Sequence, residues 1–328
     1  VTNGNMFSIE KFCMKVFDAG LQEVTFSFHW HNSTLHDYLV ATPWAFKKSL
    51  KGLIYVKKNY PNVIVNIDIV VNKVNVDYLP DIVKFFMRLW VYEYDILQII
   101  PFGRGFSQYK DVLFYNISEH KEALTKTWEL SRISWMYMWT NRFHVEAFEW
   151  YEDLIQDPRK IKSEVMWESV DMFEPFILSK GIKKPECFWE RCNYCFLQQY
   201  CHSYIDTANS KKLTVWEDEL IISGEEFPSQ VIEKYWDTKE QFQTYLWKQE
   251  KNLINIPKCL WGTWKYQAYN DIKVNTSLKD YTEKYIHNLY RKKSLRCKSC
   301  KYDSNCEGIH LNFIRTYGFD ILKPILWK

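Results

Sequence analysis

Hydrophobic and polar positions follow two alternating spacings over the first hundred residues. Apolar side chains recur at helical spacing in three segments, residues 9–17, 42–58 and 76–90. The second of these is predicted to begin at Thr42-Pro43, a capping residue followed by proline. Between the helices lie short runs rich in β-branched and aromatic residues, namely Glu23–His29, the buried strand candidate Val63–Val71 (VIVNIDIVV), and Asp95–Ile100. This alternation predicts an α/β fold with a parallel sheet.

The ends of these strands are the expected place for a ligand, because ligands of parallel α/β folds bind at the carboxyl ends of the strands. Polar or turn-forming residues stand at each end, in Thr2–Gly4, Ser27–His29, Asn72-Lys73 and Pro101–Gly103. Beyond them, residues 116–140 are predicted as a long helix rich in Trp and Met, and residues 141–150 as one more strand.

Composition excludes several classes of protein. Of 328 residues, 47% are hydrophobic and 25% charged, which is typical of a folded protein and not of a disordered one. The net charge of +3 gives no electrostatic argument for a nucleic acid or a membrane as partner. No apolar run reaches the length of a membrane span, and the first residues lack the pattern of a secretion signal. We therefore expect a cytoplasmic protein.

The cysteines carry the most specific pattern. Of nine cysteines, only Cys13 precedes residue 187, and its place on an apolar helix face predicts a core position. The spacing Cys-x2-Cys-x5-Cys occurs twice, and each triplet has a further cysteine upstream. The two predicted sets of four metal ligands are Cys187, Cys192, Cys195 and Cys201, and Cys259, Cys297, Cys300 and Cys306.

These two sets fit two iron–sulfur clusters or two zinc ions, because tetrahedral thiolates accept both metals. The odd number of cysteines and the missing secretion signal disfavour disulfides. His202 and His310 are substitute ligands, in which case Cys259 is an ordinary buried thiol.

Several segments together resemble the later strands of a radical S-adenosylmethionine enzyme. They are TNG at Thr2–Gly4, Gly20–Leu53 with its H-D-x-L-x-x-T-P-x-x-F pattern at His36–Phe46, Val63–Asn75, and IIPFGRG at Ile99–Gly105. The two cysteine triplets, the second followed by Gly308, resemble the SPASM or twitch extensions that bind auxiliary iron–sulfur clusters. The resemblance covers about residues 1–105 and 185–325. It implies a partial (β/α)6 TIM-like barrel, later strands only, in residues 1–180, and a cysteine-rich α+β extension in residues 181–328.

One part of the family's pattern is missing. The Cys-x3-Cys-x2-Cys loop that holds the catalytic cluster does not occur here, and Val1–Gly4 resembles the end of the third strand. We therefore expect a fragment, a subunit of a split enzyme, or a relative that has lost the chemistry.

The resemblance also implies a cofactor and partners. Such enzymes split S-adenosylmethionine with an electron from a 4Fe-4S cluster, and the resulting radical abstracts hydrogen from a peptide, protein or small-molecule substrate. A flavodoxin or ferredoxin is the expected electron donor. By strand position, the implied cofactor contacts are Asn3, Gly4, Ser27, Asn72, Asn75, Ile100, Pro101 and Gly103. The same residues are also ordinary turn formers and helix initiators.

Two other functions remain open on the sequence. A non-catalytic scaffold with zinc or iron–sulfur sites is the first, and an RNA-modifying enzyme is the second. The latter rests on a basic segment that contains Arg291, Lys292, Lys293, Arg296, Lys298 and Lys301, which is also typical of a solvated surface. Apart from these functions, the histidines His29, His31 and His36 stand close together in the sequence. Such a cluster fits metal binding, proton transfer or hydrogen bonds to the backbone.

Overall fold

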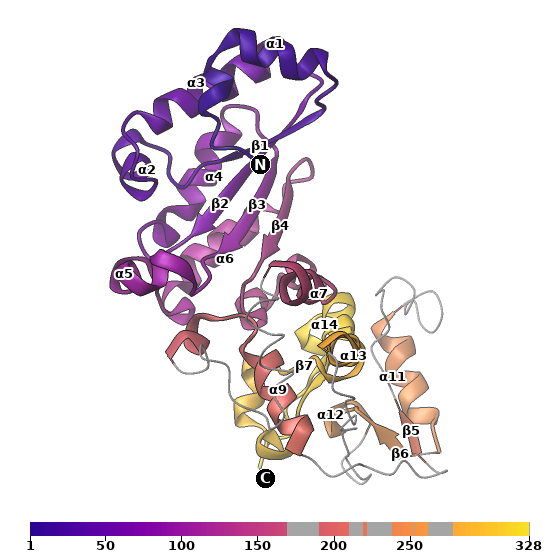
Figure 1. The fold of residues 1–328 in the computed structure, drawn as a ribbon. Helices are drawn as coiled ribbons and strands as arrows, with labels where there is room; N and C mark the ends of the chain where they lie inside the picture. The colour runs from indigo at the N-terminus through magenta and orange to yellow at the C-terminus, as the bar shows by residue number, and fades with distance from the viewer. Residues whose placement is uncertain (169–189, 210–218, 222–237, 251, 262–277, 328) are drawn as a thin grey trace. The chain divides into compact units, whose positions relative to one another are not determined.

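A computed structural model describes residues 1–168, 190–209, 219–221, 238–250, 252–261 and 278–327. The chain forms two compact units, Val1–Phe143 and His144–Lys328 (Figure 1). The predicted domain boundary between residues 180 and 181 lies outside the described ranges. Among the helices in these ranges, none has both the length and the apolar character needed to cross a membrane.

The N-terminal unit is built on a parallel sheet with strands in the order β1-β2-β3-β4. The strands are β1 (Glu23–Ser27), β2 (Ile64–Val71), β3 (Glu93–Gln98) and β4 (Tyr137–Asn141). The helices are α1 (Glu10–Asp18), α2 (Ser33–Leu39), α3 (Ala45–Asn59), α4 (Leu79–Met87), α5 (Gly103–Leu113) and α6 (Lys121–Leu130). Thr2 pairs in parallel with Phe26 and extends the sheet beyond β1. The α/β class is confirmed.

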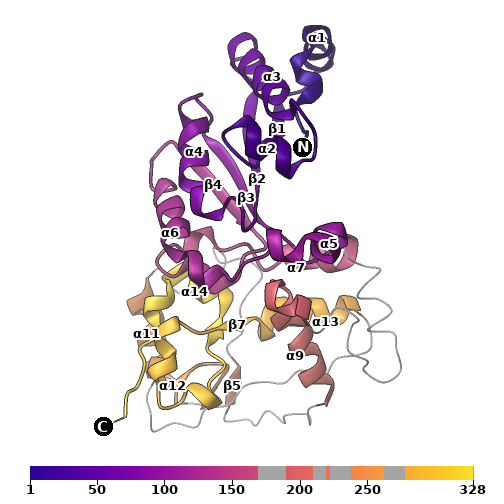
Figure 2. The same ribbon diagram turned by 90° about the vertical axis from the view of Figure 1, so that its left-hand side faces the viewer.

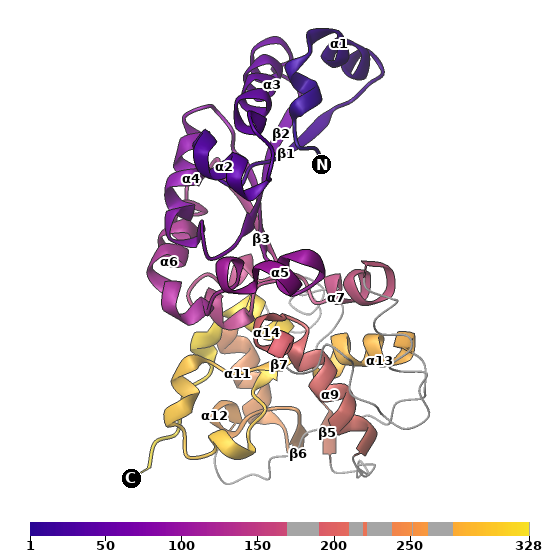
Figure 3. The same cartoon turned by 60° about the vertical axis from the view of Figure 1, so that its left-hand side comes forward.

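The sheet has one apolar and one polar face. Along β2, the side chains of Val65, Ile67, Ile69 and Val71 are all buried. Tyr94, the register partner of Ile67, donates through its hydroxyl to the carbonyl of Val83 on α4, so this face lies against α4. The ribbon shows α3, α4 and α6 on one side of the sheet (Figure 3). The alternate positions, Asn66 and Asp68 among them, point to the opposite face, because successive side chains of a strand point in opposite directions. Helices of this unit thus cover the apolar face.

The apolar face of α4 is as predicted, whereas the start of α3 is not. Helix α3 begins at Ala45, three residues after the predicted start at Thr42. Trp44 precedes it in a left-handed conformation, with φ of 67°. The carboxylate of Asp37 accepts the N–H groups of Trp44 and Phe46, each at 2.8 Å. A side chain from the preceding helix α2, seven residues before Trp44, thus supplies the cap in place of Thr42.

The long helix predicted over residues 116–140 is wrong. Helix α6 ends at Leu130, and the Trp-rich stretch after it is strand β4, not the residues 141–150 predicted as a strand. Met138 and Thr140 are buried, while Tyr137 and Trp139 are exposed. This period of two is that of a strand with one covered face, and pairing with β3 stabilises it.

The C-terminal unit has short elements around an aromatic core. Its helices are α7 (Lys160–Ser163), α9 (Gln198–Asn209), α11 (Lys239–Lys248), α12 (Lys258–Trp261), α13 (Leu278–Lys284) and α14 (Leu311–Tyr317). Its strands are the parallel pair β5 (Glu219–Ile221) and β6 (Asn252–Ile254) and the antiparallel pair β7 (Arg291–Lys292) and β8 (Ile309–His310). Helices α11 and α14 lie side by side (Figure 2), and the rings of Phe242 and Phe313 stack between them at 4.8 Å.

Asn75 holds the carboxyl ends of β1 and β2 together. Its side chain is fully buried, and its Nδ2 donates to the carbonyls of His29 and Val70, each at 3.0 Å. Its Oδ1 accepts the backbone N–H of Asn72 at 2.8 Å. Both polar ends of the amide are therefore engaged with the backbone.

We predict that Asn75→Ala lowers the free energy of unfolding by about 2–3 kcal/mol, because it leaves buried backbone groups unpaired. Urea denaturation measures the change. The matched control is Asn59→Ala, which removes one exposed bond to Tyr55 and should cost less than about 0.5 kcal/mol. Equal effects of the two substitutions would contradict the role of Asn75.

Candidate functional site

Four thiols surround one small cavity in the C-terminal unit. Cys259 comes from α12, and Cys297, Cys300 and Cys306 from the loop between β7 and β8. All four are thiols outside any disulfide. The second predicted set of four cysteines is therefore brought together, including Cys259, which stands far from the triplet in sequence. Over the described ranges, no three His, Cys, Asp or Glu side chains are placed as ligands of one metal ion.

Backbone N–H groups point at the sulfur atoms. Gly308 N–H donates to Cys306 Sγ and Ile325 N–H donates to Cys300 Sγ, each with a donor–acceptor distance of 3.4 Å. A backbone bond from Lys323 reaches Cys259. Residues 322–325 thus form one wall of the cavity, and Lys301 N–H fixes them through the carbonyl of Ile325 at 2.9 Å. Such bonds stabilise negative charge on sulfur.

Burial favours the protonated form of two of the thiols, Cys259 and Cys297, when nothing is bound. Burial and the three neighbouring cysteines raise the pKa of Cys259 to about 12, against the opposing bond from Lys323. Burial also raises the pKa of Cys297. A metal that binds here must displace these protons, so its affinity rises with pH.

The cysteine loop is closed by the β7–β8 pair, and Gly308 makes this closure possible. Gly308 has a φ of 85°, and a Cβ at this position would stand 2.0 Å from the carbonyl oxygen of Lys292. Arg291, at the start of β7, is buried and pairs with Glu307 and with Asn255 Oδ1, the latter at 2.7 Å. The loop is therefore fixed at both ends.

Carboxylates pair with most of the basic segment around the second triplet. Arg291 pairs with Glu307, Lys292 with Glu146, Lys293 with Asp303 and Arg296 with Glu149. Glu149 also accepts from Ser294 Oγ at 2.5 Å and from Leu295 N–H at 3.2 Å. These contacts anchor the loop to residues 146–149, and they neutralise the charge that the RNA hypothesis needs.

The first predicted set of ligands is only partly described. Cys192 and Cys201 are buried and Cys195 is half-buried, on the segment from Glu190 through α9. Cys187 lies outside the described residues. The substitute ligand His310 is engaged: its Nε2 donates to Ile286 O at 2.7 Å, and its Nδ1 accepts from Asn312 N–H at 3.2 Å. Cys13 is fully buried, as predicted.

The predicted cofactor contacts lie along one edge of the parallel sheet. Because all strands run the same way, Ser27 at the last position of β1, Asn72 directly after β2 and Pro101 after β3 lie toward this edge. Gly4 follows Thr2, which pairs with Phe26. Gly4 is left-handed, with φ of 75°, and Asn72 joins Asn75 in the backbone network described above. Ser27 donates to Asp68. Asn3 accepts from Ser49 Oγ through its carbonyl, while Ile100 and Gly103 flank the start of α5.

Two histidines at this edge are bonded to the backbone. Val70 N–H donates to Nδ1 of His29, and His29 N–H donates to Nδ1 of His36, each at 3.3 Å. Both neutral rings therefore carry their proton on Nε2. Burial, and then the neighbouring His36, lower the pKa of His29 to about 4. His31 stacks on Trp30, with ring centroids 5.9 Å apart.

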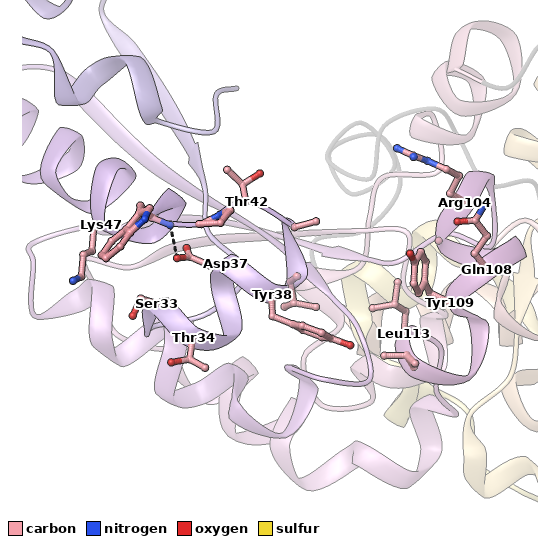
Figure 4. A pocket seen from close by; sticks show the side chains of 16 residues that line it. Ser33, Thr34, Asp37, Tyr38, Thr42, Lys47, Arg104, Gln108, Tyr109 and Leu113 are labelled. Atoms are coloured by element: carbon pink, nitrogen blue, oxygen red, sulfur yellow. Dashed lines mark hydrogen bonds between the residues drawn. The ribbon is translucent and has the colours of Figure 1, made fainter.

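A cleft of about 1060 Å³ opens at the same edge, between α2 and the start of α3 on one side and α5 on the other. Its walls come from the His36–Phe46 and Ile99–Gly105 segments and their neighbours, and Lys47 and Arg104 lie at opposite ends (Figure 4). Tyr38 and Tyr109 expose more than half of their side-chain surface in it. None of the eight predicted cofactor contacts is among the residues that line the cleft.

The sequence analysis did not single out a row of side chains on the polar face of the sheet. Ser27, Asp68, Asp95 and Trp139 are register partners on successive strands. Burial, followed by the charge of Asp95, raises the pKa of Asp68 to about 6. The available signal was the N-x-D pair within VIVNIDIVV, which places two polar side chains on one face of a strand otherwise made of apolar residues.

Comparison with known proteins finds one curated protein that is similar to part of the chain. No protein-family profile and no solved structure matches the chain. An AdoMet-dependent heme synthase from Oleidesulfovibrio alaskensis is 24% identical over 136 residues. These are 42% of this chain and 34% of the relative, so the chain matches about a third of that protein's length. The similarity supports a relation to radical S-adenosylmethionine enzymes.

We predict that Gly308→Ala opens the thiol cavity, because its Cβ collides with the backbone of β7. Alkylation of Cys297 and Cys300 by iodoacetamide, followed by mass spectrometry, should be about tenfold faster, which corresponds to about 1.4 kcal/mol of local destabilisation. The control Gly20→Ala has a similar φ of 94° but nothing within 4 Å of the added Cβ. Unchanged alkylation in Gly308→Ala would contradict the role of the glycine.

We also predict that acid destabilises the N-terminal unit through His29. The unfolded imidazole binds its proton near pH 6.5 and the folded one near pH 4. The unfolded state therefore holds more protons between these values, and the stability contributed by neutral His29 is lost as pH falls through this window, by about 3 kcal/mol.

Urea unfolding at pH 7.5, 6, 5 and 4 measures this loss. His29→Asn keeps an acceptor near the Nδ1 position but cannot titrate, so it should flatten the pH dependence. The matched control is His202→Asn at an exposed histidine, and it should leave the pH dependence of the free energy of unfolding unchanged. An acid slope that His29→Asn leaves untouched would assign the effect to other groups.

Proposed function

We propose that the protein is a radical S-adenosylmethionine enzyme, or the C-terminal portion of one, that holds an auxiliary iron–sulfur cluster at Cys259, Cys297, Cys300 and Cys306. Supporting it are the segments that resemble this family, the partial similarity to an AdoMet-dependent heme synthase, and the parallel α/β unit. We infer that the sheet corresponds to the later strands of a partial barrel.

The observation that carries the proposal is the convergence of four thiols on one cavity from two separate parts of the chain. Four cysteine thiolates are the ligands that a 4Fe-4S cluster requires, and N–H groups directed at sulfur tune its reduction potential. Gly308, Lys323 and Ile325 supply such groups here. When bound, an auxiliary cluster would supply one-electron transfer or a site that anchors substrate.

The remaining parts of the proposal concern partners and the second set of cysteines. We propose a peptide, protein or small molecule as substrate, and a flavodoxin or ferredoxin in the cytoplasm as electron donor. The cleft at the carboxyl edge of the sheet supports a small-molecule site in the N-terminal unit. Cys187, Cys192, Cys195 and Cys201 are proposed to hold a second cluster.

The alternative is a non-catalytic scaffold with structural zinc. It is favoured by the same four thiols, because zinc accepts them equally well. The ion pairs of Arg291, Lys292, Lys293 and Arg296 engage most of the basic segment and so disfavour an RNA-modifying function.

Metal analysis of the full chain, purified without oxygen, tests the proposal. A cluster at this cavity gives a broad brown absorption band and about four irons and four sulfides per chain, or about eight of each if the second set is also filled. Cys259→Ala should remove about four irons and four sulfides from the total.

Cys13→Ala is the matched control, because Cys13 is a buried thiol of the other unit whose sulfur donates to the carbonyl of Phe7. It should leave the metal content unchanged. Zinc without sulfide would reject the cluster in favour of the scaffold, and metal content insensitive to Cys259→Ala would reject this cavity as the site.

A further inference from the structure

The row Ser27, Asp68, Asp95 and Trp139 crosses the polar face of the parallel sheet. Residues paired directly across neighbouring parallel strands point to the same face, so the four side chains stand in one line. The line spans three strand spacings, about 14 Å. The thiol cavity belongs to the other unit and uses none of these residues.

Two buried oxygen atoms in this region lack a hydrogen-bond donor. Asn66 stands two residues before Asp68 on the same face and is 1% exposed. Its Oδ1 and the Oδ1 of Asp68 are buried, and neither has a partner among the residues that the structure describes. Buried polar atoms are almost always paired, because an unpaired one loses its bonds to water. Two such acceptors on one strand indicate that a donor belongs there.

The charge of the row calls for a cation. Ser27 donates to Asp68, and Asn141 Nδ2 donates to Asp95 Oδ1 at 2.5 Å, so both carboxylates already have a neutral donor. Arg142 lies near enough to lower the pKa of Asp68. Burial and the charge of Asp95 nevertheless outweigh its effect. At Asp68, the repulsion from Asp95 therefore exceeds the attraction of Arg142.

The neighbouring aromatic side chains distinguish an organic cation from a metal ion. Trp139 is 38% exposed and stands beside Asp95, and Tyr137 is 69% exposed beside Glu93. Indole and phenol rings attract cations that carry carbon substituents, and they cover the carbon skeleton at the same time. A hydrated metal ion gains nothing from these rings.

We propose that this face binds an organic ammonium group, with the ammonium on Asp68 and the adjoining carbon skeleton against Trp139. The proposal rests on the proposed function only in identifying the ligand as the substrate, which would then be an amine, a lysine side chain or a chain terminus. It deepens the substrate class without relying on a metal or on S-adenosylmethionine.

Binding of two small probes to the full chain tests the proposal. Tyramine carries an aromatic ring and an ammonium group, and 4-ethylphenol has the same ring without the charge. Ligand-observed NMR titration should show at least about tenfold tighter binding of tyramine, the factor expected for a charged hydrogen bond. Asp68→Asn should abolish this preference.

Two comparisons separate binding from folding. Asp81→Asn makes the same chemical change on an exposed residue of α4 and should keep the preference for tyramine. Asp68→Asn should keep or raise the melting temperature, because it removes the repulsion from Asp95 and offers a donor to Asn66. In the unmutated chain, affinity for tyramine should rise from pH 5 to pH 7.5 as Asp68 ionises, and in Asp68→Asn it should not.

Equal affinity for both probes, or an undiminished preference in Asp68→Asn, would overturn the proposal. Displacement of tyramine by stoichiometric Mg²⁺ would also overturn it and assign the row to a metal ion. None of these readouts depends on the thiol cavity, so a failure of iron loading and a failure of amine binding are distinguishable.

Discussion

The pairing of β2 with a strand on each side fixes its side-chain direction, and the rest of the N-terminal unit follows from it. A shift of one residue in this register would turn Ile67 and Ile69 to the polar face and Asp68 into the helix layer. The buried valines and isoleucines hold the helices, so they also hold the carboxylates in place on the other side. Asn75 then ties the strand ends together with bonds that no apolar residue could make. Packing of apolar side chains on one face of the sheet thus positions the carboxylates on the other face.

The sequence predicts the elements whose signals are local. The apolar stripe of α4 and the strand runs of β1 to β3 carry their own periodicity, and each lies close to its predicted place. Elements that depend on residues outside their own segment escape it. Helix α3 takes its cap from Asp37, and β4 is a strand because β3 pairs with it, although its Trp and Met residues also suit a helix. In VIVNIDIVV, most residues are apolar, so the run predicts a strand buried on both faces and not a polar face that carries Asn66 and Asp68.

The thiol site shows the same limit. The repeated spacing predicts that Cys297, Cys300 and Cys306 act together, because a tight loop must bring them close. Cys259 lies too far along the chain for spacing to decide between ligand and core, and its place in the cavity comes from the fold of the unit. The N–H donors of Lys323 and Ile325 are backbone groups, which almost every residue type has, so the sequence could not predict them. Four thiols in such an arrangement accept either iron or zinc.

The distance along the chain between Cys259 and Cys297 has a thermodynamic consequence. The two lie 38 positions apart, and a cluster or ion that joins them closes the intervening loop as a covalent bridge would. By the chain-entropy relation for cross-links, closing such a loop removes about 4 kcal/mol of freedom from the unfolded chain. Unlike a disulfide, this bridge forms to an extent that depends on the concentration of free metal. Once the site is saturated, each tenfold rise in that concentration adds about 1.4 kcal/mol to the free energy of unfolding. The C-terminal unit would then unfold less often, and persist longer in a cell, as the concentration of available metal rises.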